Sequence, residues 1–335
     1  MYLKFYNLET EPFSLSPDPD FLYLSEVHRE GLANLRYGLI QKKGFIVITG
    51  EVGTGKTTLI NALLAEIPQE VKVAFISNPK LERDEFFYLL SRAFNIGSGD
   101  NKAKFLIDFT KFLEQADQNN ENVVLIIDEA HCLPEDLLEE IRLLSNLETP
   151  SSKLVNIILV GQPEFEKILD HPKFRALKQR ITLRHKLEAL NKEETADYVK
   201  VRLSRAGAKD TGIFTPRALH AIYEYSGGIP RIINLLADHS MLTGFIKEAR
   251  SIDDKIIKEC ASELDIVNNA NTSSSTASSS GKKVVHEHSN YFLKIAIAVI
   301  VFLAVLIIFW FFGLSVEERQ NLISGLTNMM ISLGK

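Results

Sequence analysis

Three glycines, a lysine and a threonine stand together early in the chain in an order that suits phosphate binding. Residues 50–57 read GEVGTGKT and fit the pattern GxxxxGK[ST]. Glycines at these positions let backbone N–H groups wrap around phosphate oxygens, and a helix beginning near Thr57 adds the positive end of its dipole. Lys56 would contact the β- and γ-phosphates of a nucleotide, and the Thr57 hydroxyl would hold Mg²⁺. The motif follows an apolar run and opens a helical pattern, which separates it from a chance glycine turn.

Two acidic residues supply the second part of the predicted site. The run 123–128 ends in Asp128 and is followed by Glu129. A carboxylate at the carboxyl end of a buried strand suits the Mg²⁺ shell, and the glutamate beside it suits the polarisation of an attacking water. We therefore expect ATP and Mg²⁺ to bind here, with Thr57 and Asp128 as metal ligands. The predicted nucleotide-binding residues are Gly50, Glu51, Val52, Gly53, Thr54, Gly55, Lys56, Thr57, Thr58 and Asp128.

The letters DEAH at 128–131 also suggest a helicase. A helicase of that kind needs a second nucleotide-binding domain of the same fold, with its own arginine motif. Beyond the predicted sheet only helical patterns and a long apolar run follow, so we set that interpretation aside.

Three further polar residues could complete the site. Arg180 precedes a fifth strand, and Arg231 lies in a GGIPR segment where a helix begins. At a helix start an arginine can reach the phosphates of its own subunit, whereas Arg180 is a candidate for reaching those of a neighbour. Gln162 ends the fourth apolar run and could either sense the γ-phosphate or cap a loop. Arg175 and Arg184 are alternatives to Arg180. The predicted catalytic residues are Glu129, Arg180, Gln162 and Arg231.

Apolar runs that alternate with helical patterns indicate how these residues are positioned. The runs are nearly continuous in apolar residues, as strands buried on both faces of a sheet must be. They cover 45–49, 71–77, 123–128 and 155–161, and a weaker one begins at Ile181. Helix-period segments between them include 57–67, 84–94 and 103–116. This alternation predicts a parallel α/β sheet that carries the P-loop, in a nucleotide-binding domain of residues 1–190.

Helical patterns alone continue after about Asn191. They lie near 192–206, 215–226, 229–248 and 252–264. We therefore expect a small helical lid domain over residues 191–266.

The composition limits the classes of protein to consider. The 335 residues are enough for about two domains of ~150 residues each. With 45% hydrophobic and 24% charged residues, the chain can build a core. Its net charge of −5 gives no electrostatic footprint for nucleic acid, so no nucleic-acid partner is expected. Cys132 and Cys260 lack a metal-like CxxC spacing, and we expect reduced thiols in a cytosolic domain.

The last part of the chain changes composition twice. Residues 267–290 are rich in serine and predict a flexible linker. Residues 295–314 carry no charge and provide the ~20 residues that a helix needs to cross a bilayer. A buried core helix is the alternative, but little chain follows that could bury it. We predict a single transmembrane helix over 291–314 and a short amphipathic tail over 315–335.

Basic residues predict the orientation of that span. Lys282, Lys283 and Lys294 precede it, whereas Glu317 and Glu318 follow it. The positive-inside rule then places the N-terminal domain in the cytoplasm and the tail outside it. The absence of a basic-then-apolar signal pattern at the N-terminus agrees with this expectation.

The motifs resemble those of AAA+ ATPases of the general secretion pathway protein A (ExeA/GspA) type, which are related to pilus-biogenesis ATPases. The resemblance covers residues 1 to about 265. It rests on EPF at 11–13, SPDP at 16–19, TGEVGTGKT at 49–57, IDEA at 127–130, EIRLLSNLE at 140–148, GQPE at 161–164, QRI at 179–181 and GIPR at 228–231. It implies that Gln162, Arg180 and Arg231 act as sensor 1, arginine finger and sensor 2. It also implies that residues near 13–23 and His28 flank the adenine.

The same resemblance implies partners and a location. In that family the cytoplasmic ATPase is tied through one span to a periplasmic, often peptidoglycan-binding, domain, and it cooperates with a partner membrane protein. Almost nothing follows the predicted span here, so direct peptidoglycan binding is not expected, and His131 stands where glutamine is common. We expect a homo-oligomer in ring form at the bacterial inner membrane, with a partner membrane protein of a secretion or pilus system.

Three functions compete at this point. The favoured one is an ATP-driven factor that assembles or regulates a secretion or pilus apparatus. The second is a DNA-associated AAA+ regulator of the transposition type, which the acidic charge, the predicted span and the lack of a DNA-binding motif disfavour. The third is a nucleotide-gated scaffold that scarcely turns ATP over, which the intact pair of Asp128 and Glu129 disfavours.

Overall fold

The computed structural model describes residues 1–266 except 17–20, 69, 98–100 and 150–152. The chain divides into two units, Met1–Thr276 and Ala277–Lys335, and every described residue belongs to the first. The predicted linker (267–290), transmembrane helix (291–314) and tail (315–335) lie outside the described residues. Among the helices that are described, none is both long and apolar enough to cross a bilayer.

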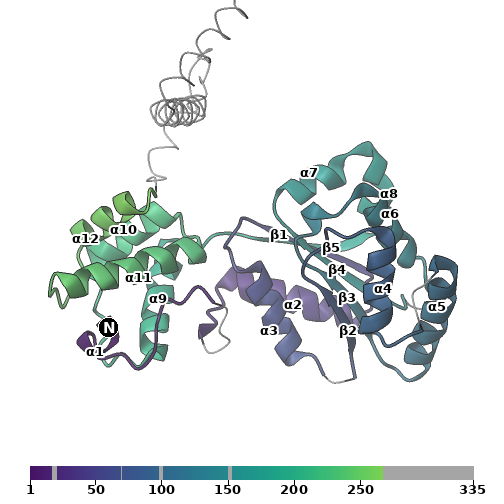
Figure 1. Cartoon of the computed structure of the whole chain (residues 1–335), viewed down its shortest axis with the longest axis horizontal. Helices are drawn as coiled ribbons and strands as arrows, with labels where there is room; N and C mark the ends of the chain where they lie inside the picture. The colour runs from purple at the N-terminus through teal and green to yellow at the C-terminus, as the bar shows by residue number, and fades with distance from the viewer. Residues whose placement is uncertain (17–20, 69, 98–100, 150–152, 267–335) are drawn as a thin grey trace, which may run out of the picture. The chain divides into compact units, whose positions relative to one another are not determined.

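Five parallel strands form one sheet in the order β2-β3-β4-β1-β5 (Figure 1). They are β1 (Phe45–Gly50), β2 (Lys72–Ile76), β3 (Val123–Ile127), β4 (Asn156–Gly161) and β5 (Ile181–Leu187). β1 pairs with β4 on one side and with β5 on the other, so the strand that leads into the glycine loop lies inside the sheet. The parallel α/β sheet predicted from the apolar runs is confirmed.

Alternate residues of the inner strands pack on opposite faces of the sheet. Phe45 and Val47 of β1 belong to one core cluster, whereas Ile46 and Ile48 belong to another. β3 and β4 are likewise buried along their whole length. Burial on both faces explains why these runs have almost no polar interruption. The edge strand β5 alternates half-buried and exposed residues up to Lys186 and ends on the buried Leu187, which accounts for its weaker apolar pattern.

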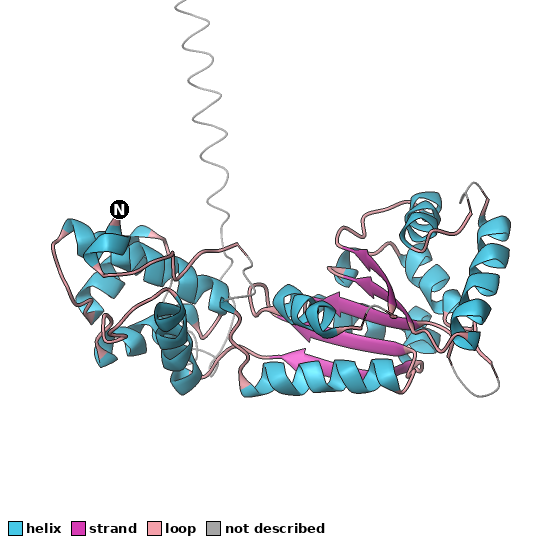
Figure 2. Cartoon of the chain, turned by 90° about the horizontal axis from the view of Figure 1, so that it is seen from below, coloured by secondary structure: helices cyan, strands magenta, loops and turns pink. Residues whose placement is uncertain are grey.

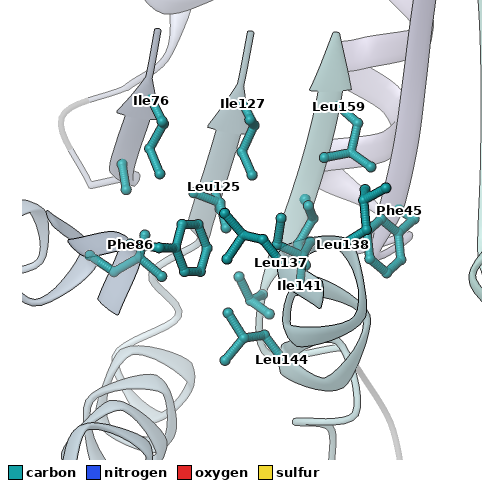
Figure 3. Packing of buried hydrophobic residues seen from close by; sticks show 14 of the residues in the cluster. Phe45, Ile76, Phe86, Leu125, Ile127, Leu137, Leu138, Ile141, Leu144 and Leu159 are labelled. Atoms are coloured by element: carbon teal, nitrogen blue, oxygen red, sulfur yellow. The ribbon is translucent and has the colours of Figure 1, made fainter. Parts of the chain in front are cut away.

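Helices cover both faces of the sheet (Figure 2). On one face lie α2 (Glu26–Ile40) and α3 (Lys56–Glu66). The other face is covered by α4 (Arg83–Ala93), α5 (Lys102–Gln118), α6 (Glu135–Leu144), α7 (Glu164–Asp170) and α8 (Arg175–Lys178), with short 3₁₀ turns at Ala130–Cys132 and Pro172–Phe174. Figure 3 shows Phe86 of α4 and Ile141 of α6 among the strand side chains of this face. α3, α4 and α5 follow the predicted ranges closely.

Within the described residues, four helices follow the sheet: α9 (Lys192–Arg205), α10 (Pro216–Ser226), α11 (Pro230–Ile246) and α12 (Asp254–Glu263). Capping residues determine where these helices begin and end. Asn191 and Glu194 form a capping box at the start of α9. Thr215 caps α10, which ends where Gly227 takes a left-handed φ of 59°. These helices agree with the four helical segments expected after Asn191.

The N-terminal segment packs with the helical part of the molecule. The segment begins with the short helix α1 (Tyr2–Phe5). Four of its aromatic residues belong to the same core cluster as residues of α9 to α12: Tyr2, Tyr6, Phe13 and Phe21. The Phe13 and Phe214 rings meet edge to face, 6.0 Å apart. The predicted domain of residues 1–190 counted this segment with the sheet. Because helices already cover both faces of the sheet, its aromatic side chains are buried against the helical core instead.

Candidate functional site

The glycine loop leaves the carboxyl end of β1 and turns directly into α3. Gly53 and Gly55 have positive φ angles of 83° and 99°, a region that side chains with a Cβ rarely adopt. Space is also short, because a Cβ on Gly55 would lie 2.9 Å from Nε2 of His28. Two of the three predicted glycines are therefore required by backbone conformation.

Lys56 is the first residue of α3 and is only 6% exposed. Its ammonium group donates to the carbonyl oxygens of Gly50 (2.8 Å) and Glu51 (3.0 Å). Burial lowers the pKa of Lys56, and the nearby carboxylates of Glu129 and Asp128 oppose that shift. The loop's own carbonyls thus hold the lysine head group at the loop.

Thr57 joins the loop to the end of β3. Its hydroxyl donates to Oδ2 of Asp128 over 2.7 Å. The other carboxylate oxygen of Asp128 accepts from the Glu129 N–H at 2.8 Å, while the Asp128 N–H donates to the Ile76 carbonyl. Asp128 is only 4% exposed. A hydroxyl and a carboxylate oxygen side by side are hard donors of the kind Mg²⁺ prefers, so this pair fits the predicted metal site.

Glu129 extends from a left-handed backbone position (φ 52°) and lines the same cavity as the loop. The side-chain amide of Gln162 donates to its Oε2 at 3.2 Å. Nδ1 of His131 accepts from the Gln162 backbone N–H at 3.4 Å, which leaves the ring proton on Nε2, 3.4 Å from the same Glu129 oxygen. Gln162 and His131 therefore orient Glu129 together. Sequence reasoning had given His131 no role.

The glycine loop lines a cavity of about 330 Å³. The other lining residues come from two parts of the chain. The first group is Ser14, Leu15, Ser16, Phe21, Leu22, Tyr23 and His28, and the second is Leu190, Tyr198, Arg202, Pro230, Arg231 and Asn234. The first group includes much of the segment expected near the adenine, although Phe13 lies in the helical core instead. Residues of the second group other than Arg231 were not foreseen.

Arg202 connects the N-terminal segment to the helical part beside this cavity. Its guanidinium donates to the carbonyls of Pro12 and Ser14 and to the hydroxyl of Tyr198. It also lies 5.0 Å from the centre of the Phe21 ring. No local motif marks an arginine that acts in this way, since the two carbonyls that it binds are almost two hundred residues away in sequence.

His28 supports the loop from α2. Its Nε2 lies 2.9 Å from the Thr54 carbonyl, to which it must donate, and its Nδ1 lies 2.7 Å from the Ser25 hydroxyl. These contacts suit a neutral imidazole with its proton on Nε2. Burial lowers the pKa of His28, in agreement with that form. The neutral ring thus props the loop between Gly53 and Lys56.

Arg231 lies at the start of α11 and lines the cavity. Its backbone N–H donates to the Gly53 carbonyl at 3.3 Å. Just before it, Gly228 (φ 75°) packs so tightly that a Cβ would lie 1.8 Å from the Leu190 carbonyl oxygen. Leu190 in turn donates its N–H to the Gly228 carbonyl. The structure therefore brings Arg231 to the glycine loop of its own chain.

Arg180 lies at the other end of the sheet. β1 and β5 pair from Phe45 opposite Ile181 to Gly50 opposite Leu187, a separation of ~20 Å at ~3.3 Å per residue. The Arg180 guanidinium donates to the Ser145 hydroxyl (2.7 Å) and the Arg142 carbonyl. Arg180 therefore cannot reach the cavity of its own chain.

The two alternatives to Arg180 differ in their contacts. Arg184 pairs with Glu166 at 2.8 Å. Arg175 is exposed, and its side chain has no hydrogen bond or ion pair to another residue that the structure describes.

Comparison with known proteins agrees with this geometry. A family model described as an AAA domain matches residues 39–169. General secretion pathway protein A of Aeromonas hydrophila is 42% identical over 255 residues, which cover 75% of this chain and 46% of that protein. The chain thus matches about half the length of this relative. The resemblance inferred from the motifs is confirmed.

Solved structures share the fold at low sequence identity. The ORC2 protein of Aeropyrum pernix, solved as ADPNP–ADP complexes, has a TM-score of 0.58 and 19% identity, covering 76% of this chain and 72% of that one. Drosophila ORC bound to DNA has a TM-score of 0.61 and 14% identity, covering 83% of this chain and 69% of that one. These likenesses establish an AAA-type fold and nothing further.

The neutral state of His28 predicts a pH dependence of stability. Because burial lowers its pKa from the ordinary 6.5, the unfolded chain takes up a proton first as pH falls. The contribution of His28 to the free energy of unfolding should be complete above pH ~6.5 and decline below it. Denaturant unfolding of the full chain at pH ~7.5 and ~5.5 should show this loss, and His28→Asn should show less of it.

His220→Asn is the matched control, because His220 lies at the surface of α10, where it pairs with Glu224. It should keep most of the parental pH dependence. If His28→Asn loses as much stability between pH ~7.5 and ~5.5 as the parent does, the assignment of a buried, neutral imidazole to His28 is wrong.

Proposed function

Because this chain is a relative of general secretion pathway protein A and carries an AAA domain, we propose that it is a membrane-anchored ATPase. In this proposal it hydrolyses ATP to drive or regulate the assembly of a secretion or pilus apparatus at the bacterial inner membrane. A partner membrane protein of that apparatus is part of the proposal. The name of the relative supports the process, and the site supports the reaction.

The main observation in support of the proposed reaction is the hydrogen bond between Thr57 and Asp128. It brings the helix that follows the glycine loop against the acidic end of β3. The N–H groups of the loop and Lys56 would bind the phosphates of ATP, and Thr57 and Asp128 would hold Mg²⁺. Bound Mg²⁺ would offset the charge of the phosphate oxygens.

Glu129 is the proposed base. Its carboxylate lies in the cavity and accepts hydrogen bonds from Gln162, so it is held by a fixed donor. From there it would accept a hydrogen bond from the attacking water and align that water with the γ-phosphate. Gln162 would sense the γ-phosphate while positioning Glu129. Arg231, from α11, would reach the phosphates of its own subunit.

Arg180 supports an oligomer as the active form. Arg180 lies at the end of the sheet away from its own cavity, so it could act only on a nucleotide bound by a neighbouring subunit. In a ring, each interface would then combine Glu129 of one subunit with Arg180 of the next. Such an arginine stabilises the charge of the transition state. Arg175 and Arg184 remain the alternatives for this role.

The membrane anchor of the proposal is residues 291–314, preceded by the linker 267–290. The uncharged run 295–314 and the lysines before it support a single span with the ATPase domain in the cytoplasm. Hydrolysis at the cavity would then reach the membrane through the linker.

Glu129→Gln should slow ATP turnover by ~10²-fold or more while leaving ATP affinity nearly unchanged, because it removes the base and keeps the phosphate contacts. Steady-state phosphate release and equilibrium nucleotide binding, measured on the full chain, test this. Glu135→Gln is the control, since Glu135 is an exposed partner of Lys173 outside the cavity. Parental turnover in Glu129→Gln would exclude Glu129 as the base.

Arg180→Ala should bind ATP normally but hydrolyse it ~10³-fold more slowly, because the transition state loses a charge partner. Mixing it with Glu129→Gln should restore part of the activity. In the mixed oligomer, one interface combines Glu129 of the arginine variant with Arg180 of the glutamate variant. Turnover measured against mixing ratio should therefore pass through a maximum.

The same mixing done with Arg184→Ala or Arg175→Ala in place of Arg180→Ala identifies the arginine. Only the variant of the arginine that reaches the neighbour should be both inactive alone and rescued by Glu129→Gln. Turnover that does not change with protein concentration, in a strictly monomeric chain with ATP present, would refute the interface.

A topology experiment tests the anchor. A reporter that works only outside the cytoplasm should be active when fused after Lys335, because the span would carry the tail across the membrane. The same reporter fused after Ser280 should be silent. Activity of the Ser280 fusion, or the reverse pattern, would overturn the proposed orientation.

A further inference from the structure

Three side chains with metal-binding chemistry meet where α11 packs on α12. They are His239 of α11 and Cys260 and Glu263 of α12. None of them lines the nucleotide cavity. We propose that these residues form a binding site for a borderline divalent cation of the zinc type, independent of the ATPase site.

The three ligand atoms already lie close together. The imidazole nitrogen, the thiol sulfur and a carboxylate oxygen are all within 4.8 Å of one another. His239 Nε2 is 3.0 Å from Glu263 Oε2. Metal–ligand distances of ~2.0–2.3 Å in a tetrahedral site place its ligands ~3.3–3.7 Å apart. The side chains would therefore need only small rotamer adjustments to surround an ion.

Helical spacing explains the convergence. Cys260 and Glu263 are three residues apart, one turn of α12, so both face the same neighbour. Thr243 follows His239 by one turn of α11, and the Cys260 thiol donates to its hydroxyl at 3.4 Å. α11 thus presents His239 and Thr243 to Cys260 and Glu263.

The donor set selects the class of ion. A thiolate, an imidazole and a carboxylate together suit Zn²⁺ and Co²⁺, whereas Mg²⁺ and Ca²⁺ prefer oxygen donors alone. Binding would replace the thiol proton of Cys260 by the metal and release that proton to solvent. A water molecule would complete the coordination.

An ion can reach this site from solvent. The side chains of His239 and Glu263 are 34% and 54% exposed, whereas Cys260 is buried beneath them. Lys247, whose charge interacts with Cys260 and Glu263, is paired with Glu259. A bound ion would tie α12 to α11, the helix whose first turn carries Arg231 to the glycine loop. The site would therefore stiffen the helical part of the molecule.

The competing explanation is a surface ion pair above a buried thiol. The chain offers a matched comparison in His220 and Glu224 of α10, which lie 3.5 Å apart. That pair is not part of a metal-ligand cluster within the described residues. Substitutions of His239 or Glu263 should therefore affect metal binding by the Cys260 thiolate, whereas a substitution of His220 should not.

Titration of the full chain with Co²⁺ tests the site, because a thiolate bound to Co²⁺ gives a charge-transfer band in the near ultraviolet. The chain has only two cysteines, so the source of a band can be assigned. The parent and Cys132→Ser should show the band, and Cys260→Ser should lose it. His239→Ala and Glu263→Gln should weaken Co²⁺ affinity by about tenfold or more, while His220→Ala should not. Zn²⁺ should displace Co²⁺ and abolish the band.

The absence of a thiolate band in the parent would overturn the proposal. So would a band that survives in Cys260→Ser or disappears in Cys132→Ser. If Cys260→Ser does not fold, the exposed positions decide, because His239→Ala and Glu263→Gln leave the buried thiol intact. Parental Co²⁺ affinity in both of these variants would refute the site. All these measurements are made without nucleotide, so they do not depend on ATP hydrolysis.

Discussion

A parallel sheet covered by helices on both faces can present polar side chains only at its ends. In this protein the middle strands β3, β4 and β1 are buried throughout, and each meets its first functional residue where the strand finishes. Gly50 ends β1, Asp128 follows β3, and Gln162 follows β4. Because these strands are neighbours in the sheet, their carboxyl ends share one edge. The hydrogen bond between Thr57 and Asp128 is possible only because of that shared edge.

Features with a local cause could be predicted from the sequence. The strands could be predicted because burial on both faces of the sheet requires continuous apolar runs. The helices that follow the sheet could be predicted because capping residues such as Asn191 and Thr215 mark where they begin. The residues of the glycine loop were visible because phosphate binding restricts their types. The loop, Asp128, Glu129, Gln162 and Arg231 accordingly lie together in the structure.

Features that depend on contacts distant in sequence could not be predicted. Arg202 lines the cavity because it bonds backbone carbonyls of the N-terminal segment, and carbonyls leave no trace in a sequence. The packing of Phe13 against Phe214 could not be predicted either, because the two residues are far apart in sequence. His131 lies close to the predicted acidic pair, yet its role depends on Gln162 of the next strand. Even Arg180, expected near a phosphate, could be placed relative to its own cavity only once the register of β1 and β5 was known.

The close contact between Gly228 and Leu190 has a mechanical consequence. Leu190 belongs to the short connection that leaves the sheet, and Gly228 belongs to the turn that places Arg231 at the glycine loop. Gly228 therefore lies three positions before Arg231, close to both the connection and the glycine loop. A rotation of the helical part about this connection would move Arg231 along the loop, and a phosphate bound by Arg231 would oppose that rotation. The orientation of the helical part would then depend on whether Arg231 contacts a phosphate.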